Sequence, residues 1–138
     1  MSRYNSEQVA YNPLKKKYVP LWRLDTNTVT VTHFNADTLT TESKTYHTDY
    51  VQYHLSFSAS HYPDRLRRLV NEGKIMQYLD DFEQRVRDAI DRQVEIWKQS
   101  NKEYQSAVLA GDIQKAAGIE KCLVSMAREV VFECMVYI

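Results

Sequence analysis

The sequence predicts an α+β fold in which a small antiparallel sheet of two to three strands, in the N-terminal half, packs on a short helix and a long antiparallel helical hairpin. Two observations predict it. Residues 1–61 contain no Gly and are rich in Thr and Tyr, which favour strands. Residues 63–138 place apolar side chains at steps of three or four, the spacing of a helical face. The length of 138 residues predicts one domain, 1–138.

The β region is expected over residues 13–60, after a flexible arm at 1–12. Apolar and polar residues alternate over 28–34 and again over 51–58, which is the period of a half-buried strand. Turns are expected at 25–27 and 35–37, because Asn and Asp close turns through their own side chains.

The helical region, 63–138, is expected to hold helices at about 63–72, 74–110 and 112–137. Pro63 suits a helix start and Gly73 a helix stop. Gly111 followed by Asp112 indicates a tight turn between two antiparallel helices. Gly118 suggests close approach of another backbone. We expect core packing for the bulky side chains on the apolar stripes, namely Trp97, Tyr104 and Tyr137.

Charge balance and hydropathy disfavour several classes of protein, although local basic patches stay compatible with nucleic-acid binding. Eighteen Lys and Arg balance eighteen Asp and Glu, so the chain lacks the global positive field of non-specific nucleic-acid binders. The N-terminal residues lack an apolar core, so no signal peptide is predicted. No apolar run is long enough for a membrane span, and we expect a cytoplasmic protein of a bacterial host cell. Cys122 and Cys134 are expected as buried free thiols.

No catalytic or metal-binding pattern emerges, so we expect a non-enzymatic protein without cofactor or metal. His47, His54 and His61 are seven residues apart, which places alternate members on opposite faces of a strand. We therefore expect them at the surface or at a sheet edge. Glycine-rich phosphate loops and nucleophile signatures are absent.

Two basic clusters provide the candidate nucleic-acid site. Lys15, Lys16 and Lys17 stand beside Tyr18, Trp22 and Arg23, and cations interleaved with aromatic rings can hold single strands. The short helix at 63–72 carries the second cluster, which consists of Arg65, Arg67 and Arg68. The alternative interpretation is solvated charge, with Trp22 in the core.

The helical half resembles the TnpV family of conjugative transposons and related mobile elements. The resemblance lies in Gly73-Lys74-Ile75, Tyr78-Leu79, Asp80-Asp81 and Glu83-Gln84, and in the closing run AREVVFECMVYI. It covers about residues 60–138, with a faint match at 18–21, whereas residues 25–60 look unlike the family. The family has no accepted catalytic residues, so the resemblance implies a mobile-element origin and a helical interaction module.

The first functional expectation is therefore an interaction protein from a phage or mobile element that binds and sterically inhibits a host complex. A nucleic-acid-targeting effector, such as a CRISPR nuclease, is the candidate partner. An acidic helical face could compete for a basic channel, and an aromatic side chain could anchor in a pocket. The expected contact residues are Asp80, Asp81, Glu83, Asp88 and Tyr50.

The alternative is a DNA-binding accessory factor for transfer or excision of the element, which would use the two basic clusters. A homodimer through the helical hairpin is compatible with either function, because a helix as long as 74–110 needs a partner along its length.

Overall fold

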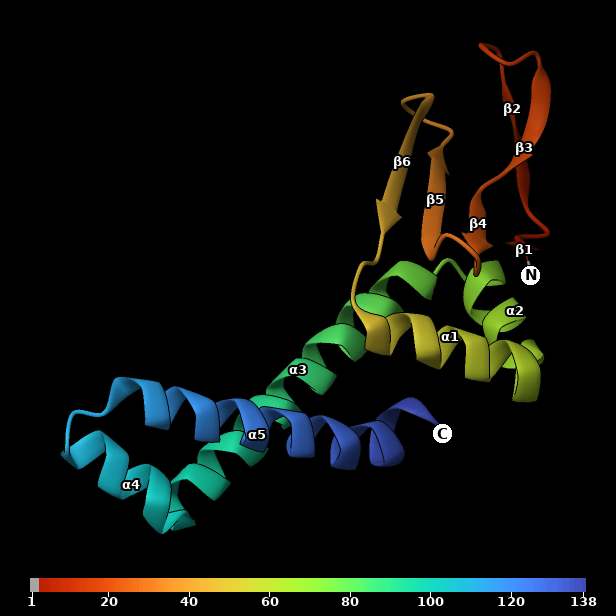
Figure 1. Ribbon diagram of the computed structural model, residues 1–138. Helices are drawn as coiled ribbons and strands as arrows, with labels where there is room; N and C mark the ends of the chain where they lie inside the picture. The colour runs from red at the N-terminus through yellow and green to blue at the C-terminus, as the bar shows by residue number, and fades with distance from the viewer. Residues whose placement is uncertain (1–2) are drawn as a thin grey trace. The chain divides into compact units, whose positions relative to one another are not determined.

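The computed structural model describes residues 3–138, which form two compact units (Figure 1). The first unit comprises residues 3–83 together with Tyr137–Ile138, and the second comprises Gln84–Val136. Helices and antiparallel strands are both present, so the α+β class is confirmed. The details differ from the prediction in both halves of the chain.

The first unit contains more strands than the two or three predicted. A four-stranded antiparallel sheet has the order β1-β4-β5-β6, and β2 pairs with β3 in a separate hairpin. The predicted arm at 1–12 is wrong for its described part, because residues 3–5 and 9–12 are strands. The strands are β1 (Arg3–Asn5), β2 (Val9–Asn12), β3 (Lys17–Pro20), β4 (Trp22–Asp25), β5 (Thr30–Asn35) and β6 (Thr40–Thr45).

One type of turn closes all three hairpins between adjacent strands. An Asn or Asp side chain at the end of the first strand accepts a hydrogen bond from the backbone N–H two residues later. A residue with positive φ directly precedes the second strand. The pairs of first and last residue are Asn12 and Lys16, Asp25 and Val29, and Asn35 and Leu39. The predicted turns at 25–27 and 35–37 are confirmed.

The strand predicted over 51–58 is wrong, because this segment lies inside helix α1 (Asp49–His61). Val51 and Leu55 are buried, which both periods allow, but Tyr53 is exposed, which only the helical period allows. His54 is also buried, against the expected surface position. The helix is favoured over a strand because it buries five side chains in one core. They belong to Tyr50, Val51, His54, Leu55 and Ser58.

Helix α2 (Pro63–Asn71) confirms the predicted short helix, and Gly73 ends it with a φ of +70°. Strands β1 and β4 pack on α2 (Figure 1). The core of this unit combines the sheet with α1, α2 and the first turns of α3 (Ile75–Ser100). Its fully buried side chains include Leu24, Val31, Val51, Leu55, Leu66, Ile75 and Leu79.

The long helix predicted over 74–110 is interrupted at Asn101, so the long helical hairpin is replaced by a shorter one. Asn101 has extended backbone and its side chain accepts a hydrogen bond from Tyr104 N at 2.8 Å, which caps a new helix, α4 (Lys102–Leu109). Gln105 Nε2 donates to Lys98 O, one of the carbonyls left free by the break. Helix α5 (Ile113–Val131) pairs with the short α4.

The turn between α4 and α5 is confirmed, with Gly111 at a φ of +72° and Asp112 accepting from Lys115 N at 3.1 Å. The helix predicted at 112–137 is α-helical only as far as Val131, and the chain continues as a π-helical turn over Phe132–Val136.

Several burial predictions for the helical half are wrong. No backbone approaches Gly118, since an added Cβ would have open space around it among the described residues. Cys122 and Cys134 are exposed free thiols. Tyr137 is exposed as well, while Trp97 and Tyr104 are half-buried. In the second unit, the buried positions belong to smaller side chains, which include Val86, Ile90, Val94, Ala107, Leu123, Ala127, Val131 and Val136.

Candidate nucleic-acid interface

The turn of the β2–β3 hairpin presents three consecutive lysines. The Asn12 side chain accepts from Leu14 N at 3.0 Å, and Lys15 N donates to Asn12 O at 3.2 Å. Lys16 then takes a φ of +55°, which brings Lys17 back into register opposite Asn12. The ammonium groups of Lys15, Lys16 and Lys17 are therefore carried by an ordered turn, and all three residues are exposed.

Two tyrosines lie opposite each other on the same hairpin. Tyr11 of β2 pairs with Tyr18 of β3, and their rings meet edge to face with centroids 5.4 Å apart. The rings remain accessible, since Tyr11 is 47% and Tyr18 69% exposed. Val9 and Leu14 add further exposed apolar surface. Aromatic rings in water beside cations are typical of surfaces that bind bases.

A hollow with a volume of about 140 Å³ brings the hairpin together with the four-stranded sheet. We call it the basic hollow. It contains three cations, two threonine hydroxyls and no carboxylate among its described lining residues. The lining is formed by Asn12, Lys15, Lys17, Tyr18, Val19, Pro20, Arg23, Thr32, Phe34 and Thr41.

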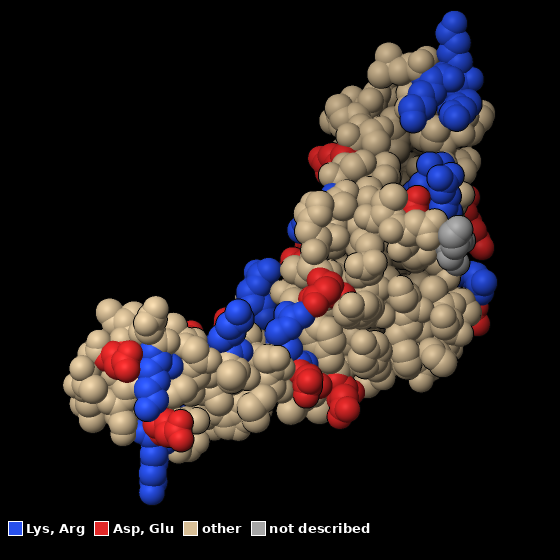
Figure 2. All heavy atoms as spheres, viewed as in Figure 1, with Lys and Arg blue, Asp and Glu red and all other residues tan. Residues whose placement is uncertain are grey.

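The local charge is strongly positive although the whole chain is neutral. Residues 8–24 contain four Lys or Arg and no Asp or Glu, so acidic residues outnumber basic ones in the rest of the chain. In Figure 2, Lys and Arg side chains gather around the tip of the β2–β3 hairpin. The net charge of residues 8–24 is therefore opposite in sign to that of the rest of the chain.

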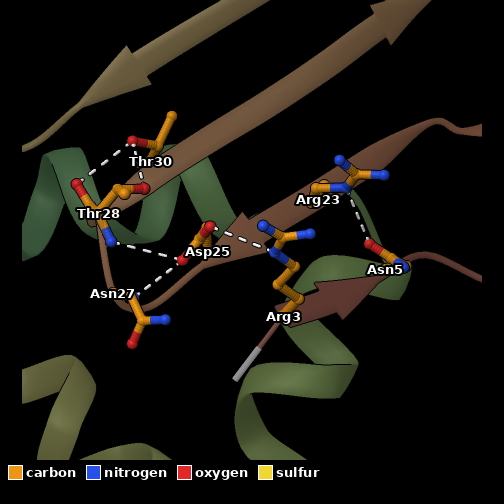
Figure 3. Close-up of polar contacts among 7 residues, drawn as sticks. All are labelled: Arg3, Asn5, Arg23, Asp25, Asn27, Thr28 and Thr30. Carbon is orange, nitrogen blue, oxygen red and sulfur yellow. Dashed lines mark hydrogen bonds and ion pairs between the residues drawn. The ribbon is translucent and has the colours of Figure 1, made fainter. Parts of the chain in front are cut away.

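Arg23 is oriented by a neighbouring strand (Figure 3). Its Nε donates to Asn5 Oδ1 at 3.1 Å, which fixes the guanidinium beside β1. The nearby carboxylate, Asp25, is matched by Arg3 at 3.4 Å. Burial on its own would raise the pKa of the Asp25 carboxyl. Hydrogen bonds from the backbone N–H groups of Asn27 and Thr28 and the charge of Arg3 lower the pKa by more than burial raises it, so the carboxyl stays ionised.

The second predicted basic cluster does not join the first. Arg65 is half-buried and donates through Nη2 to Ser58 Oγ at 2.7 Å. Arg67 pairs with Asp64, and Arg68 Nε lies 3.9 Å from a Glu72 carboxylate oxygen. None of Arg65, Arg67 and Arg68 lines the basic hollow. Of the predicted basic residues, the structure brings together only Lys15, Lys17 and Arg23, with Lys16 at the turn.

The residues expected to contact a protein partner are largely engaged inside the first unit. Asp80 accepts hydrogen bonds from Lys44 Nζ at 2.5 Å and from Tyr46 OH at 2.7 Å. Burial opposes ionisation, but these two donors and the Lys44 charge lower the pKa of Asp80. Glu83 accepts from Thr48 Oγ1 at 2.8 Å, and Tyr50 is only 6% exposed. Tyr50 therefore does not present its ring to a partner.

The remaining two acidic residues are exposed. Asp81 lies at the surface, and Asp88 accepts from Gln84 Nε2 at 2.8 Å. A single acidic face of Asp80, Asp81, Glu83 and Asp88 is thus not formed by freely presented carboxylates.

His33, His54 and His61 each pack against an aromatic ring. His54 stacks on Phe82 with centroids 4.1 Å apart and shares a 2.7 Å hydrogen bond with Tyr78 OH. His33 stacks on Trp22 at 4.1 Å, which leaves Trp22 half-buried. Within residues 3–138 there is no group of three His, Cys, Asp or Glu placed to hold a metal ion.

The second unit has an apolar hollow at the elbow between α4 and α5. Its volume is about 250 Å³, and it is lined by Ala107, Val108, Gly111, Asp112, Ile113, Ala116, Ala117 and Glu120. Large apolar side chains stand in water beside it, with Leu109 88% and Ile113 82% exposed. We call this surface the elbow patch.

Sequence reasoning missed several residues of the interface, among them Tyr11, Thr32 and Thr41. Tyr11 could have been found from Asn12-Pro13, a turn signal that places residues on either side of it in a hairpin. The two threonines come from β5 and β6, and no local signal links them to residues 15–23.

Comparisons with known proteins give no relative: no protein-family model, no curated protein and no solved structure matches the chain. In the described part of the chain, no helix combines the length and the apolar character needed to cross a membrane.

Proposed function

We propose that this protein is a non-enzymatic nucleic-acid-binding protein and that the β2–β3 hairpin is its contact element. The observation that carries the proposal is the basic hollow, where Lys15, Lys17 and Arg23 surround a space lined by hydroxyl groups and by no described carboxylate. Phosphate oxygens are the ligands that such a donor set suits. This corresponds to the accessory-factor function expected from the sequence, with one basic cluster in place of two.

The neutral net charge does not oppose this proposal. Counterion release depends on the cations that meet phosphates, not on the charge of the whole chain. The four cations of residues 8–24 form a local site, and Asp25, outside that stretch, is already matched by Arg3. Binding should therefore be salt-sensitive, with a slope set by about three or four phosphate contacts.

The test is a fluorescence anisotropy titration of labelled DNA and RNA oligonucleotides at two salt concentrations. The variant K15Q/K16Q/K17Q should lose most of its affinity and lower the salt slope. The matched control K102Q/K115Q/K121Q makes the same charge change at exposed lysines of the second unit and should bind as the parent does. Absence of binding at low salt, or equal losses in both variants, would contradict the proposal.

The elbow patch supports a second candidate function, binding of a protein partner. Leu109 and Ile113 are apolar side chains of the kind that anchor interfaces in a partner's pocket. Four expectations remain predictions from the sequence. They are a partner among host nucleic-acid-targeting effectors, a mobile-element origin, the TnpV-like relationship and a homodimer.

Size-exclusion chromatography with light scattering measures both possibilities for the elbow patch. The parent chain would run as a dimer, or would co-elute with an added purified defence nuclease, and the variant L109S/I113S would do neither. A parent chain that runs as a monomer and does not co-elute with the nuclease would count against this second function.

A further inference from the structure

We infer that the nucleic acid bound by the hairpin is single-stranded, with one backbone phosphate in the basic hollow and an adjacent base stacked on Tyr18. This inference rests on the proposed function and names its ligand. It depends on Tyr18, which both lines the hollow and leaves 69% of its surface exposed.

Tyr18 is held in place without being covered. Tyr11, its cross-strand partner, meets it edge to face with centroids 5.4 Å apart and an interplanar angle of 69°. An edge-to-face neighbour fixes a ring while leaving a face of it open for stacking. The ring therefore enters binding already ordered, which reduces the entropy lost when a base stacks on it.

The hollow adds directional donors to the positive charge. Thr32 of β5 and Thr41 of β6 are among its lining residues, and Arg23 supplies a guanidinium held by Asn5. The Thr32 hydroxyl shares a 3.3 Å hydrogen bond with Ser43 Oγ, and it can donate to a ligand when Ser43 is the donor of that pair. Hydroxyl and guanidinium donors around a recess suit the oxygens of one phosphate. A phosphate placed there lies beside Tyr18, so the base of the same or the next nucleotide can reach the ring.

A duplex would use less of this surface. Its bases are stacked on one another inside the helix, so an exposed tyrosine face has nothing to stack on. Only phosphate contacts would remain, and the apolar surface of Tyr11, Tyr18 and Val9 would stay in water. A single strand offers both phosphates and base faces at nucleotide spacing.

An anionic membrane surface also attracts lysines, and Leu14 at the hairpin turn is exposed. A flat surface would meet the turn, however, and would leave unused the donors that Thr32 and Thr41 of the four-stranded sheet place in the recess. The recessed donors therefore favour a flexible phosphodiester chain over a lipid headgroup layer.

The experiment compares four probes by anisotropy or sedimentation: a labelled DNA strand of about 12 nucleotides, its RNA equivalent, the DNA duplex, and phosphatidylserine vesicles. The parent should bind the single strands more tightly than the duplex. Tyr18→Ala should weaken single-strand binding by about tenfold and leave duplex binding unchanged, while Tyr18→Phe should retain the affinity. Tyr53→Ala removes an exposed tyrosine from α1 and should have no effect.

The outcomes separate this inference from the proposed function. Equal affinity for strand and duplex, with Tyr18→Ala neutral, would overturn the inference and leave nucleic-acid binding intact. No binding to any oligonucleotide would overturn both, and binding to vesicles alone would replace both with a lipid surface. Circular dichroism of Tyr18→Ala checks that the variant is folded, and Tyr18→Phe tests stacking independently of that result.

Discussion

Individual residues in this chain show how backbone geometry and packing can make one glycine indispensable and another replaceable. Gly73 has a φ of +70°, and a Cβ added to it would lie 2.7 Å from Trp22 Nε1. Gly118 lies within α5, and an added Cβ would meet nothing within 4 Å among the described residues. The two positions differ in both respects that decide the effect of a methyl group.

The substitution Gly73→Ala should therefore destabilise the protein by at least about 1–2 kcal/mol, the cost of left-handed backbone for an L-residue. Displacement of Trp22 from its stack on His33 adds to this cost. Gly118→Ala should instead stabilise it by up to about 1 kcal/mol through helix propensity. Urea denaturation of both variants measures the difference, and equal effects would contradict the geometry of Gly73.

Asp80 links acid sensitivity to the first unit. Burial opposes its charge, but hydrogen bonds from Lys44 and Tyr46 lower its pKa in the folded state. The carboxylate therefore contributes stability that is fully present above the unfolded pKa, about 3.9, and is lost as the pH falls through the lower folded pKa. Burial and the same hydrogen bond to Asp80 raise the pKa of Tyr46, which keeps its hydroxyl protonated as the donor.

The variant Asp80→Asn should have a lower melting temperature at pH 7 and a shallower decline of that temperature between about pH 5 and pH 2. Asp81→Asn makes the same chemical change on the adjacent exposed side chain and is the control. Thermal melts across this pH range provide the measurement. Parallel profiles for the parent and Asp80→Asn would show that the Lys44 and Tyr46 contacts do not stabilise the carboxylate.

At the scale of elements, the three hairpin turns each end in a non-glycine residue with positive φ. Leu39 adopts a φ of 58° with a side chain that is partly exposed, whereas Val29 adopts 53° with a buried side chain. The strained backbone is the same in both turns, but the packing that offsets it is present mainly at Val29. This difference allows a matched comparison.

Leu39→Gly should stabilise the β5–β6 hairpin by about 1 kcal/mol, because glycine adopts positive φ without steric cost. Val29→Gly should destabilise the protein, because loss of a buried valine side chain costs about 1.5–3 kcal/mol. Chemical denaturation of the two variants tests the pair. Destabilisation by Leu39→Gly would mean that the partly exposed leucine contributes packing that its accessibility does not suggest.

Sequence periodicity predicted elements well where only one period fitted the pattern. It identified α2 and the helical character of 75–131, and it found β5 and the turns on both sides of it. It failed over 51–58, where Val51 and Leu55 satisfy both a strand and a helix and only the tertiary core decides between them. Periodicity also predicted one continuous helix across Asn101. In the structure the Asn101 side chain caps the start of a new helix, although the apolar spacing continues past it.

The candidate site was predictable only in its local part. Lys15, Lys16, Lys17, Arg23 and Tyr18 lie within nine residues of one another in the sequence, so composition alone indicated them. The hollow also needs Thr32 and Thr41, which reach it through strand pairing that no local pattern specifies. In the second basic cluster, Arg67–Asp64 and Arg68–Glu72 have the spacing of neighbours on one helix face, so the sequence could have indicated both pairs. The contact of Arg65 with Ser58 joins two helices and could be seen only in the folded chain.

On the scale of the whole molecule, zero net charge conceals an uneven distribution. Residues 8–24 hold four basic side chains and no acidic one, so the chain should be retained on a cation exchanger at pH 7 and low salt. K15Q/K16Q/K17Q should flow through, while K102Q/K115Q/K121Q, with the same net charge, should be retained. Identical elution of the two variants would show that net charge alone governs retention.

The exposure of strand β6 predicts which of its residues can vary among homologues. All six of its side chains are exposed, so neither face of the strand is held in place by the core. Its register depends on the turn from Asn35 to Leu39 and on Lys44, which reaches Asp80. Among homologues of this chain, residues 40–45 should therefore vary freely except at Lys44 and at Thr41, which lines the basic hollow. The number of residues in the preceding turn should stay constant, because an insertion there would turn every side chain of the strand to the opposite face.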